Sequence, residues 1–355
     1  MREAAVDIVR QLQDAGFTAF WVGGCVRDLL LNRTPGDYDI ATSALPEDIE
    51  KLFRRTIAVG RKFGVMVVIV DGRQFQVATF RTEADYRDGR HPERVSFGDA
   101  MADARRRDFT INGLFYDPVR EQLHDWVNGE QDLRKKIIRT IGSPQERFAE
   151  DHLRLLRAVR FATQLGFNIE AGTLTAIKQQ AATIRNISAE RVRDELIKLF
   201  QPPHAARGLK LLQESRLLEH VLPELVPTIT CEQSLDFHPE GTVFEHILLI
   251  LEMFLVLLSR YRQSAKLTIQ WDPILIHQLY LAIIHIHLAH YNILVTLALP
   301  LRTGYNAFRS LGLPEENLKS FSTHPFGGLY AYWYWSTRDY SGSTRKANFG
   351  LGQTG

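Results

Sequence analysis

The order of apolar and polar residues divides the first 230 residues into a mixed segment and a helical one. β-Branched and aromatic residues crowd four short runs near the N-terminus, and such runs are typical of strands. The pattern therefore predicts strands at 17–22, 38–41, 65–70 and 75–80. Helical spacing or a favourable first turn predicts helices at 2–15, 25–32, 46–54 and 108–115.

Beyond residue 144 the apolar repeats have helical spacing throughout. They predict helices at 153–165, 174–184, 189–200 and 205–218, with Ser188 as the N-cap of the third. Prolines 202, 203, 223 and 227 interrupt the pattern. We therefore expect an α+β head at 1–140 with a small, mostly antiparallel sheet. All-α neck and body regions are expected to follow, with a helical neck at 141–230 and a divergent, mostly helical C-terminal region at 231–355.

Composition narrows the class of protein without naming it. A chain of 355 residues with 45% hydrophobic content can bury a large core, and its net charge of +2 gives no global basic field. Positive charge is local instead, at 105–107 and 135–136, as a groove for RNA requires. Two cysteines and no signal-peptide core at the N-terminus are typical of a cytoplasmic protein.

Asp37 and Asp39 form the most informative pair in the chain. On a strand, residues two apart project from the same side, so both carboxylates would lie together. Two crowded carboxylates resist joint ionisation unless a cation lies between them, and Mg²⁺ prefers such oxygen ligands.

Gly23 and Gly24 separate a predicted strand from a predicted helix, upstream of the acid pair. Strand, double glycine and helix start form a cradle in which backbone N–H groups and Arg27 face an anion. A phosphate site beside a metal-binding acid pair indicates phosphoryl or nucleotidyl transfer.

Two further clusters each allow two interpretations. Asp108 and Asn112 are four residues apart on a predicted helix and would share one of its faces. They belong either to a functional site or to a solvated helix start. Asp151 and Arg154 are either a weak surface ion pair or groups that recognise the edge of a base. The polar segment 84–92 predicts a mobile loop, and no histidine in the first 230 residues is placed like a general base.

These strings, taken together, resemble a known family. In order they are 22–28, 37–42, 77–81, 106–112, 150–151 with Arg154, and 190–191 with 195–196. Their order and spacing over about residues 10–230 resemble the class II tRNA nucleotidyltransferase and bacterial poly(A) polymerase family, in the DNA polymerase beta superfamily.

The resemblance implies roles for individual residues. Asp37 and Asp39 are expected to be catalytic and to hold two Mg²⁺ ions. A larger set is expected to bind the nucleotide, CTP or ATP: Gly23, Gly24, Arg27, Arg107, Asp108, Asn112, Asp151, Arg154, Arg157 and Arg160. Within it, Asp151 and Arg154 would pair with the base in place of a template, and Arg107, Asp108 and Asn112 would contact ribose and phosphates. Structural support is expected from Asp28, Glu190, Arg191 and Glu195.

The implied function is template-independent addition of CMP and AMP to the 3′ end of tRNA, with poly(A) addition as the alternative. The implied partners are RNA 3′ ends, with neither DNA nor a membrane, and the pattern assigns no oligomeric state. Gln76 occupies a position that is acidic in many relatives, so a third alternative is a catalytically weakened RNA-binding relative.

The C-terminal third departs from the family pattern. Segment 237–246 resembles the start of an appended domain with a His-Asp metal motif, but no His-Asp pair follows. Residues 273–301 contain no Asp, Glu, Lys or Arg, which allows a membrane span or, because of His277, His285, His287 and His290, a buried helical hairpin. The change of composition after about residue 255 also fits a shifted reading frame.

Overall fold

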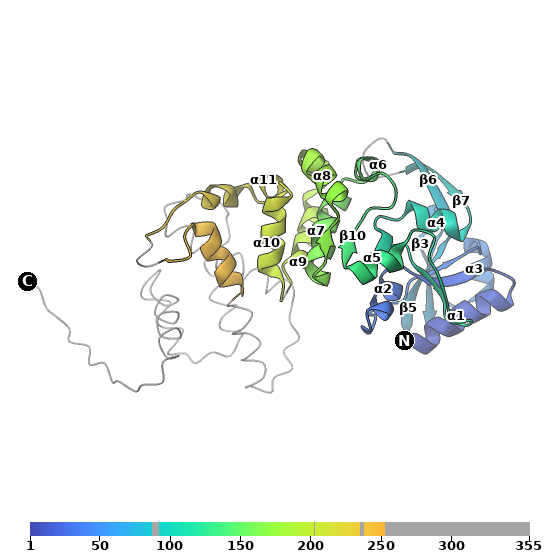
Figure 1. Ribbon diagram of the computed structural model, residues 1–355. Coiled ribbons are helices and arrows are strands. Elements are labelled where there is room, and N and C mark those ends of the chain that lie inside the picture. The colour runs from blue at the N-terminus through green and yellow to red at the C-terminus, as the bar shows by residue number, and fades with distance from the viewer. Residues whose placement is uncertain (87–91, 202, 235–237, 253–355) are drawn as a thin grey trace, which may run out of the picture. The chain divides into compact units, whose positions relative to one another are not determined.

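The structure is a computed structural model that describes residues 1–86, 92–201, 203–234 and 238–252 (Figure 1). The chain divides into two units, Met1–Leu267 and Thr268–Gly355, and the second lies outside the described residues. The charge-free stretch 273–301, its histidines and the suspected frame change after 255 are therefore expectations about residues outside this description.

A seven-stranded sheet forms the centre of the head, with strand order β3-β4-β5-β2-β1-β8-β9. Its strands are β1 (Ala19–Val22), β2 (Ile40–Thr42), β3 (Thr56–Gly60), β4 (Val65–Val70), β5 (Arg73–Thr79), β8 (Phe115–Asp117) and β9 (Gln122–His124). Every neighbouring pair is antiparallel except β2 with β5, which is parallel. The expected α+β head with a mostly antiparallel sheet is confirmed.

Short helices flank this sheet and follow from local sequence. They are α1 (Arg2–Asp14), α2 (Gly24–Leu30), α3 (Pro46–Leu52), α4 (Ala100–Arg106) and α5 (Gly129–Lys135), with 3-10 turns η1 (Arg61–Phe63) and η2 (Thr110–Asn112). In α1, Ala5, Ile8 and Leu12 are buried at helical spacing. The indole of Trp21 donates a 3.2 Å hydrogen bond to the Ala5 carbonyl, which fixes α1 against β1.

The helix expected at 108–115 is wrong except for the single turn η2. Backbone from residues 108–110 pairs instead with residues 139–141: Thr110 N donates to Arg139 O, and Ile141 N donates to Asp108 O. Phe109 and Thr140 form an isolated antiparallel bridge. These long-range hydrogen bonds satisfy the backbone in an extended form, which local spacing does not reveal.

The described ends of the loop expected at 84–92, residues 84–86 and 92, are strand instead. Strands β6 (Arg81–Tyr86) and β7 (Pro92–Phe97) form a two-stranded antiparallel sheet, and only 87–91 lie outside the described residues. Each strand is six residues long, and the ladder between them satisfies backbone groups that the polar composition had suggested were solvated.

The helices of the neck confirm the apolar repeats. They are α6 (Pro144–Glu150), α7 (Leu153–Leu165), α8 (Ala171–Gln180), η3 (Ala181–Asn186), α9 (Ala189–Leu199), α10 (Ala205–Glu214), α11 (Leu218–Val221) and η4 (Pro223–Ile229). Helix α7 has the bounds that the sequence predicted and packs against α9 and α10, while α6 packs against α8. Ser188 occupies the N-cap of α9, but its side chain makes no capping hydrogen bond.

Two features join the head to the neck and extend the helical part. The short strands β10 (Ile137–Ile138) and β11 (Asn168–Ile169) are parallel partners on opposite sides of the boundary expected at residue 140. Residues 243–252 are helical, at the end of the described chain. Among all helices of the described residues, none combines the length and the apolar character that a membrane crossing requires.

Candidate nucleotidyltransferase site

Asp37 and Asp39 flank a buried tyrosine. Tyr38 packs on Trp21 of β1, with ring centroids 4.7 Å apart, whereas Asp37 is exposed and Asp39 is partly buried. One detail of the prediction is wrong: β2 begins at Ile40, so both aspartates precede the strand. The carbonyl of Asp39 still accepts a 3.0 Å hydrogen bond from Val22 N, which holds this segment against the end of β1.

The two carboxylates influence each other electrostatically. Burial and then the charge of Asp37 raise the pKa of Asp39 to about 6, while Arg107 acts in the opposite direction. The pair therefore disfavours joint ionisation unless positive charge is added. Oxygen-only donors with this property fit a hard divalent cation, so the residues present suit the Mg²⁺ that the family resemblance implies.

The glycine turn lies at the end of β1, where Val22 is hydrogen-bonded to Asp39. Gly23 has φ +73°, which L side chains rarely adopt, and Gly24 begins α2. A Cβ added at Gly23 would lie 3.1 Å from Arg107 Nη1, so the absent side chain allows the guanidinium to lie against the backbone. The predicted elbow is present, and it brings Arg107 to the same place.

Arg107 is held by two groups that the sequence analysis did not identify. Asp103, buried in α4, accepts hydrogen bonds from Arg107 Nε at 3.2 Å and Nη2 at 3.0 Å. The Arg107 guanidinium also lies 5.0 Å from the centre of the Phe115 ring. The i,i+4 spacing of Asp103 and Arg107 is the sequence signal that could have indicated this pair.

Arg27 belongs to a chain of polar side chains that leads into the neck. Its Nε donates to Asp28 Oδ1 at 2.9 Å, and its Nη1 donates to Asn112 Oδ1 at 2.8 Å. Asn112 Nδ2 in turn donates to Asp108 Oδ1 at 3.1 Å, and Asp108 Oδ2 accepts from Arg157 of α7. One hydrogen-bonded network thus joins five residues: Asp28, Arg27, Asn112, Asp108 and Arg157. The sequence spacing indicated only its central pair, Asp108 and Asn112.

Asp108 is fully engaged within this network. It is buried, and besides Asn112 and Arg157 it accepts the backbone N–H of Phe109. Burial alone would raise its pKa, but the Arg157 charge and the hydrogen bonds from Arg157 and Asn112 outweigh burial and hold the pKa at about 2. Asp108 and Asn112 therefore support Arg27 here, and their expected contacts with the nucleotide stay a prediction.

The two residues expected to pair with the base lie at the start of α7. Arg154 is buried, and its Nη1 donates to Glu150 Oε2 at 2.6 Å and to Arg147 O at 3.0 Å. Asp151 Oδ2 accepts a 3.3 Å hydrogen bond from Arg191 Nη2. Both groups face local partners in this structure, and their role in base selection stays a prediction.

The expected supporting residues behave differently from one another. Glu195 is buried and accepts a 2.5 Å hydrogen bond from Arg160 Nε, so Arg160 is part of the neck core. Arg191 orients Asp151. Glu190 is exposed, and its side chain has no hydrogen-bond or ion-pair partner among the residues that the structure describes.

Gln76 lies beside the acid pair by strand register. Ile40 of β2 is aligned with Val77 of β5 in the parallel pair, which aligns Asp39 with Gln76 one residue earlier. Val77 is buried and Gln76 is exposed, so the Gln76 side chain leaves the sheet on the face opposite to the core. The position expected to be acidic is therefore next to Asp39.

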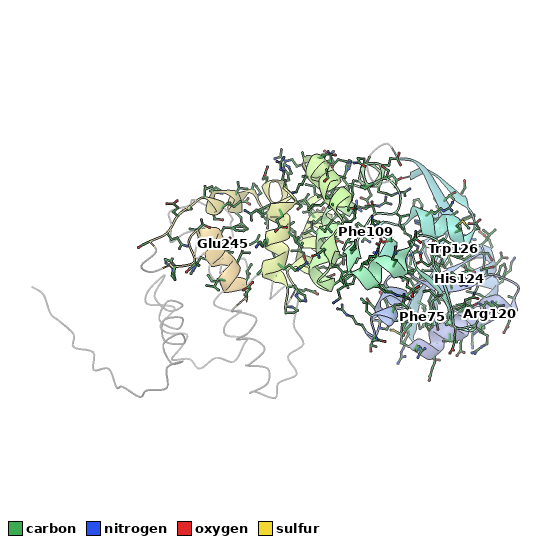
Figure 2. The ribbon with its side chains drawn as sticks, in the orientation of Figure 1. Phe75, Phe109, Arg120, His124, Trp126 and Glu245 are labelled. Carbon is green, nitrogen blue, oxygen red and sulfur yellow. The ribbon has the colours of Figure 1, made fainter. Side chains whose placement is uncertain are left out.

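A separate cluster lies near the end of the described chain. Glu240 Oε1 is hydrogen-bonded by His238 Nδ1 at 3.2 Å and by His246 Nδ1, and one ligand atom of each residue lies within 4.8 Å of the others. Such a set can hold a metal ion. Glu240 and Glu245, the latter labelled in Figure 2, also line a hollow of about 350 Å³ beside Arg207 of α10.

Family models define the class of protein to which this arrangement belongs. A model described as "Poly A polymerase head domain" matches residues 19–139, which contain the acid pair, the glycine turn and Arg107. A second, described as "Probable RNA and SrmB- binding site of polymerase A", matches residues 166–228 of the neck. The head is therefore a nucleotidyltransferase head.

The chain is also similar to individual curated proteins. The chain is 47% identical over 216 residues to the CCA-adding enzyme of Geobacillus stearothermophilus, which is 61% of this chain and 53% of that protein. It is 44% identical over 218 residues to the CCA-adding enzyme of Lactobacillus helveticus, with 61% and 54% covered. The chain thus spans about half the length of these curated relatives.

A solved structure extends the comparison to most of both chains. The CCA-adding enzyme of Bacillus stearothermophilus in complex with CTP is 34% identical with a TM-score of 0.64, covering 90% of this chain and 70% of that one. The chain belongs to the family of class II tRNA nucleotidyltransferases and bacterial poly(A) polymerases.

Proposed function

We propose that this chain adds CMP and AMP from CTP and ATP to the 3′ end of tRNA without a nucleic-acid template. The observation that carries the proposal is the acid pair beside the glycine turn, where Asp39, Gly23 and Arg107 converge. Relatives at 44–47% identity are named CCA-adding enzymes, which favours tRNA over a general RNA 3′ end.

Asp37 and Asp39 would hold Mg²⁺, two ions in the proposed reaction. When bound, the metal supplies activation of the RNA 3′-hydroxyl and charge stabilisation on the leaving pyrophosphate. The chain's own contribution is electrostatic: Arg107 and Arg27 present guanidinium groups beside the glycine turn, where they bind and orient triphosphate oxygens. Asp103 and Asp28 hold these two arginines in place.

Base selection falls to Asp151 and Arg154 in this proposal. A carboxylate accepts and a guanidinium donates in one plane, which suits the Watson–Crick edges of C and A. Arg154 is bound to Glu150, so recognition of a base requires that Arg154 exchange hydrogen bonds with Glu150 for hydrogen bonds with the base. This exchange gives Glu150 a share in nucleotide choice. The two free cysteines among the described residues fit a cytoplasmic site of action.

The deciding experiment offers purified protein three tRNA substrates, ending before C74, before C75 and before A76, with CTP alone, ATP alone or both. With CTP alone, the proposal expects C to be added only to the first two substrates. With ATP alone, it expects A to be added only to the third. With both nucleotides, all three should be extended to CCA and synthesis should stop there. Long A tails on any RNA would support poly(A) addition instead.

A catalytically weakened relative is the second candidate, because Gln76, next to the β5 residue that pairs with Ile40, occupies a position that the family resemblance implies to be acidic. It would bind these tRNAs without releasing pyrophosphate in Mg²⁺. Turnover that depends on Asp39 would exclude it.

A further inference from the structure

Phe161 of α7 lies at the centre of three guanidinium groups. The Cζ atoms of Arg160, Arg157 and Arg27 lie 3.9, 5.3 and 5.4 Å from the centre of its ring. Arg157 and Arg160 belong to the same helix, but Arg27 comes from α2 in the head. One neck side chain therefore contacts the arginine that the proposed function assigns to the triphosphate.

The three arginines around this ring are each paired with their own carboxylate. Arg27 pairs with Asp28, Arg157 with Asp108 and Arg160 with Glu195. The cluster is thus balanced in charge, and the ring separates three like charges that would otherwise repel. An aromatic face favours cations within about 6 Å of its centre, so Phe161 stabilises each guanidinium where it lies.

Arg27 has little freedom left beside this ring. Its Nε and Nη2 face Asp28, its Nη1 faces Asn112, and the Phe161 ring lies beside the guanidinium. Phe161 is itself fixed, because Phe109 meets it edge-to-face at 5.8 Å (Figure 2 labels Phe109). Only 7% of Phe161 is exposed, which leaves its ring to act through other side chains.

We propose that Phe161 is a positioning residue that holds Arg27 in place for the triphosphate, so that a neck side chain sets nucleotide affinity. This proposal rests on the proposed function only for the identity of the ligand. The alternative is that Phe161 merely fills the core between α7 and residues 108–110. The two interpretations differ in which part of the nucleotide responds to loss of the ring.

The test measures equilibrium binding of CTP, pyrophosphate and CMP to the full chain, without RNA. Phe161→Leu removes the ring and keeps an apolar side chain. Phe161→Tyr keeps the ring, and Phe148→Leu removes a fully buried phenylalanine of α6 that has no described guanidinium contact. Phe161→Met, which fills more of the space, serves if Phe161→Leu does not fold.

We expect the ring-less variants to bind CTP and pyrophosphate about tenfold more weakly, the size expected for loss of one partly desolvated cation–π contact. Binding of CMP should be unchanged, Phe161→Tyr should bind like the wild type, and Phe148→Leu should lose thermal stability without losing affinity. Equal weakening of CTP and CMP, or wild-type affinity in both ring-less variants, would overturn the proposal.

The outcome also separates this inference from the proposed function. Wild-type protein that binds CTP through its triphosphate but never extends tRNA would refute CCA addition and leave the role of Phe161 standing. Wild-type extension of tRNA with unaltered CTP affinity in the ring-less variants would do the reverse. Wild-type protein that binds neither CTP nor pyrophosphate would refute both.

Discussion

Arg157 Nη2 lies 2.5 Å from Asp108 Oδ2, and this ion pair connects α7 to the segment after α4. Asp108 has its carboxylate oxygens occupied by Arg157, Asn112 and the Phe109 N–H. An aspartate that the family resemblance implied as a contact for ribose is therefore, in this structure, one of the connections between Arg27 and the neck.

The Asp108–Arg157 pair predicts a specific pH dependence of stability. The folded pKa of Asp108, about 2, is below the ordinary value of 3.8, so its contribution is present above pH 4 and lost as the pH falls towards 2. The difference corresponds to about 2 kcal/mol. Denaturant unfolding of the wild type and Asp108→Asn between pH 2 and 7 should show a gap that narrows in this range. A gap that is constant with pH would contradict the prediction.

Asp39→Asn should reduce nucleotide transfer by about a hundredfold or more, because the amide replaces a charge that holds the cation. The affinity for tRNA should stay nearly unchanged, since Asp39 is in the head and only partly exposed. Steady-state incorporation and filter binding measure the two quantities. A parallel loss of tRNA affinity would show that the variant disturbs more than the metal site.

Gln76→Glu should strengthen divalent-cation binding, because it adds a carboxylate at the position aligned with Asp39. We expect roughly a tenfold lower Kd for Mn²⁺ by calorimetric titration, about 1.4 kcal/mol. Gln74→Glu is the matched control, since it adds the same charge on the same strand and face, two residues farther away. Equal effects of both substitutions would mean that the added negative charge acts through the overall electrostatic field and not as a ligand at the metal site.

Gly23→Ala should weaken both folding and nucleotide binding. The new Cβ would lie 3.1 Å from Arg107 Nη1, and φ +73° is strained for alanine, at a cost of about 1–3 kcal/mol. Denaturant midpoints and CTP affinity should fall together. Gly72→Ala, which also has positive φ but no atom within 4 Å of the new Cβ, should affect stability alone.

Arg154→Ala should blur the choice between correct and incorrect nucleotides by roughly tenfold to a hundredfold, the usual discrimination of a bidentate base contact. The ratio of kcat/KM for CTP over UTP on a tRNA ending before C74 measures this choice. Arg185→Ala, at an exposed arginine of η3, is expected to leave the ratio unchanged. An unaltered ratio in Arg154→Ala would remove it from base selection.

Local patterns predicted much of this molecule, because many of its elements are determined by nearby residues. The apolar repeat at 153–165 gave α7 with its bounds, and the spacing of Asp37 and Asp39 around Tyr38 gave the acid pair. Features that depend on distant partners were missed. Residues 108–110 form backbone hydrogen bonds with 139–141, and Phe161 contacts Arg27, which is 134 positions earlier in the chain. Contacts between such distant positions produce no periodic pattern in the sequence.

Asn112 shows how narrow the chemical requirement at one position can be. Its amide oxygen faces the cationic Arg27 and its amide nitrogen faces the anionic Asp108, so the orientation of the group is dictated from both ends. An aspartate at position 112 has the same shape, but its carboxylate would repel the carboxylate of Asp108. A leucine could form a hydrogen bond with neither Arg27 nor Asp108. A carboxamide accepts a hydrogen bond at one end and donates one at the other. Asn112 can therefore link the buried Asp108 to Arg27 although these two charged side chains are not in direct contact.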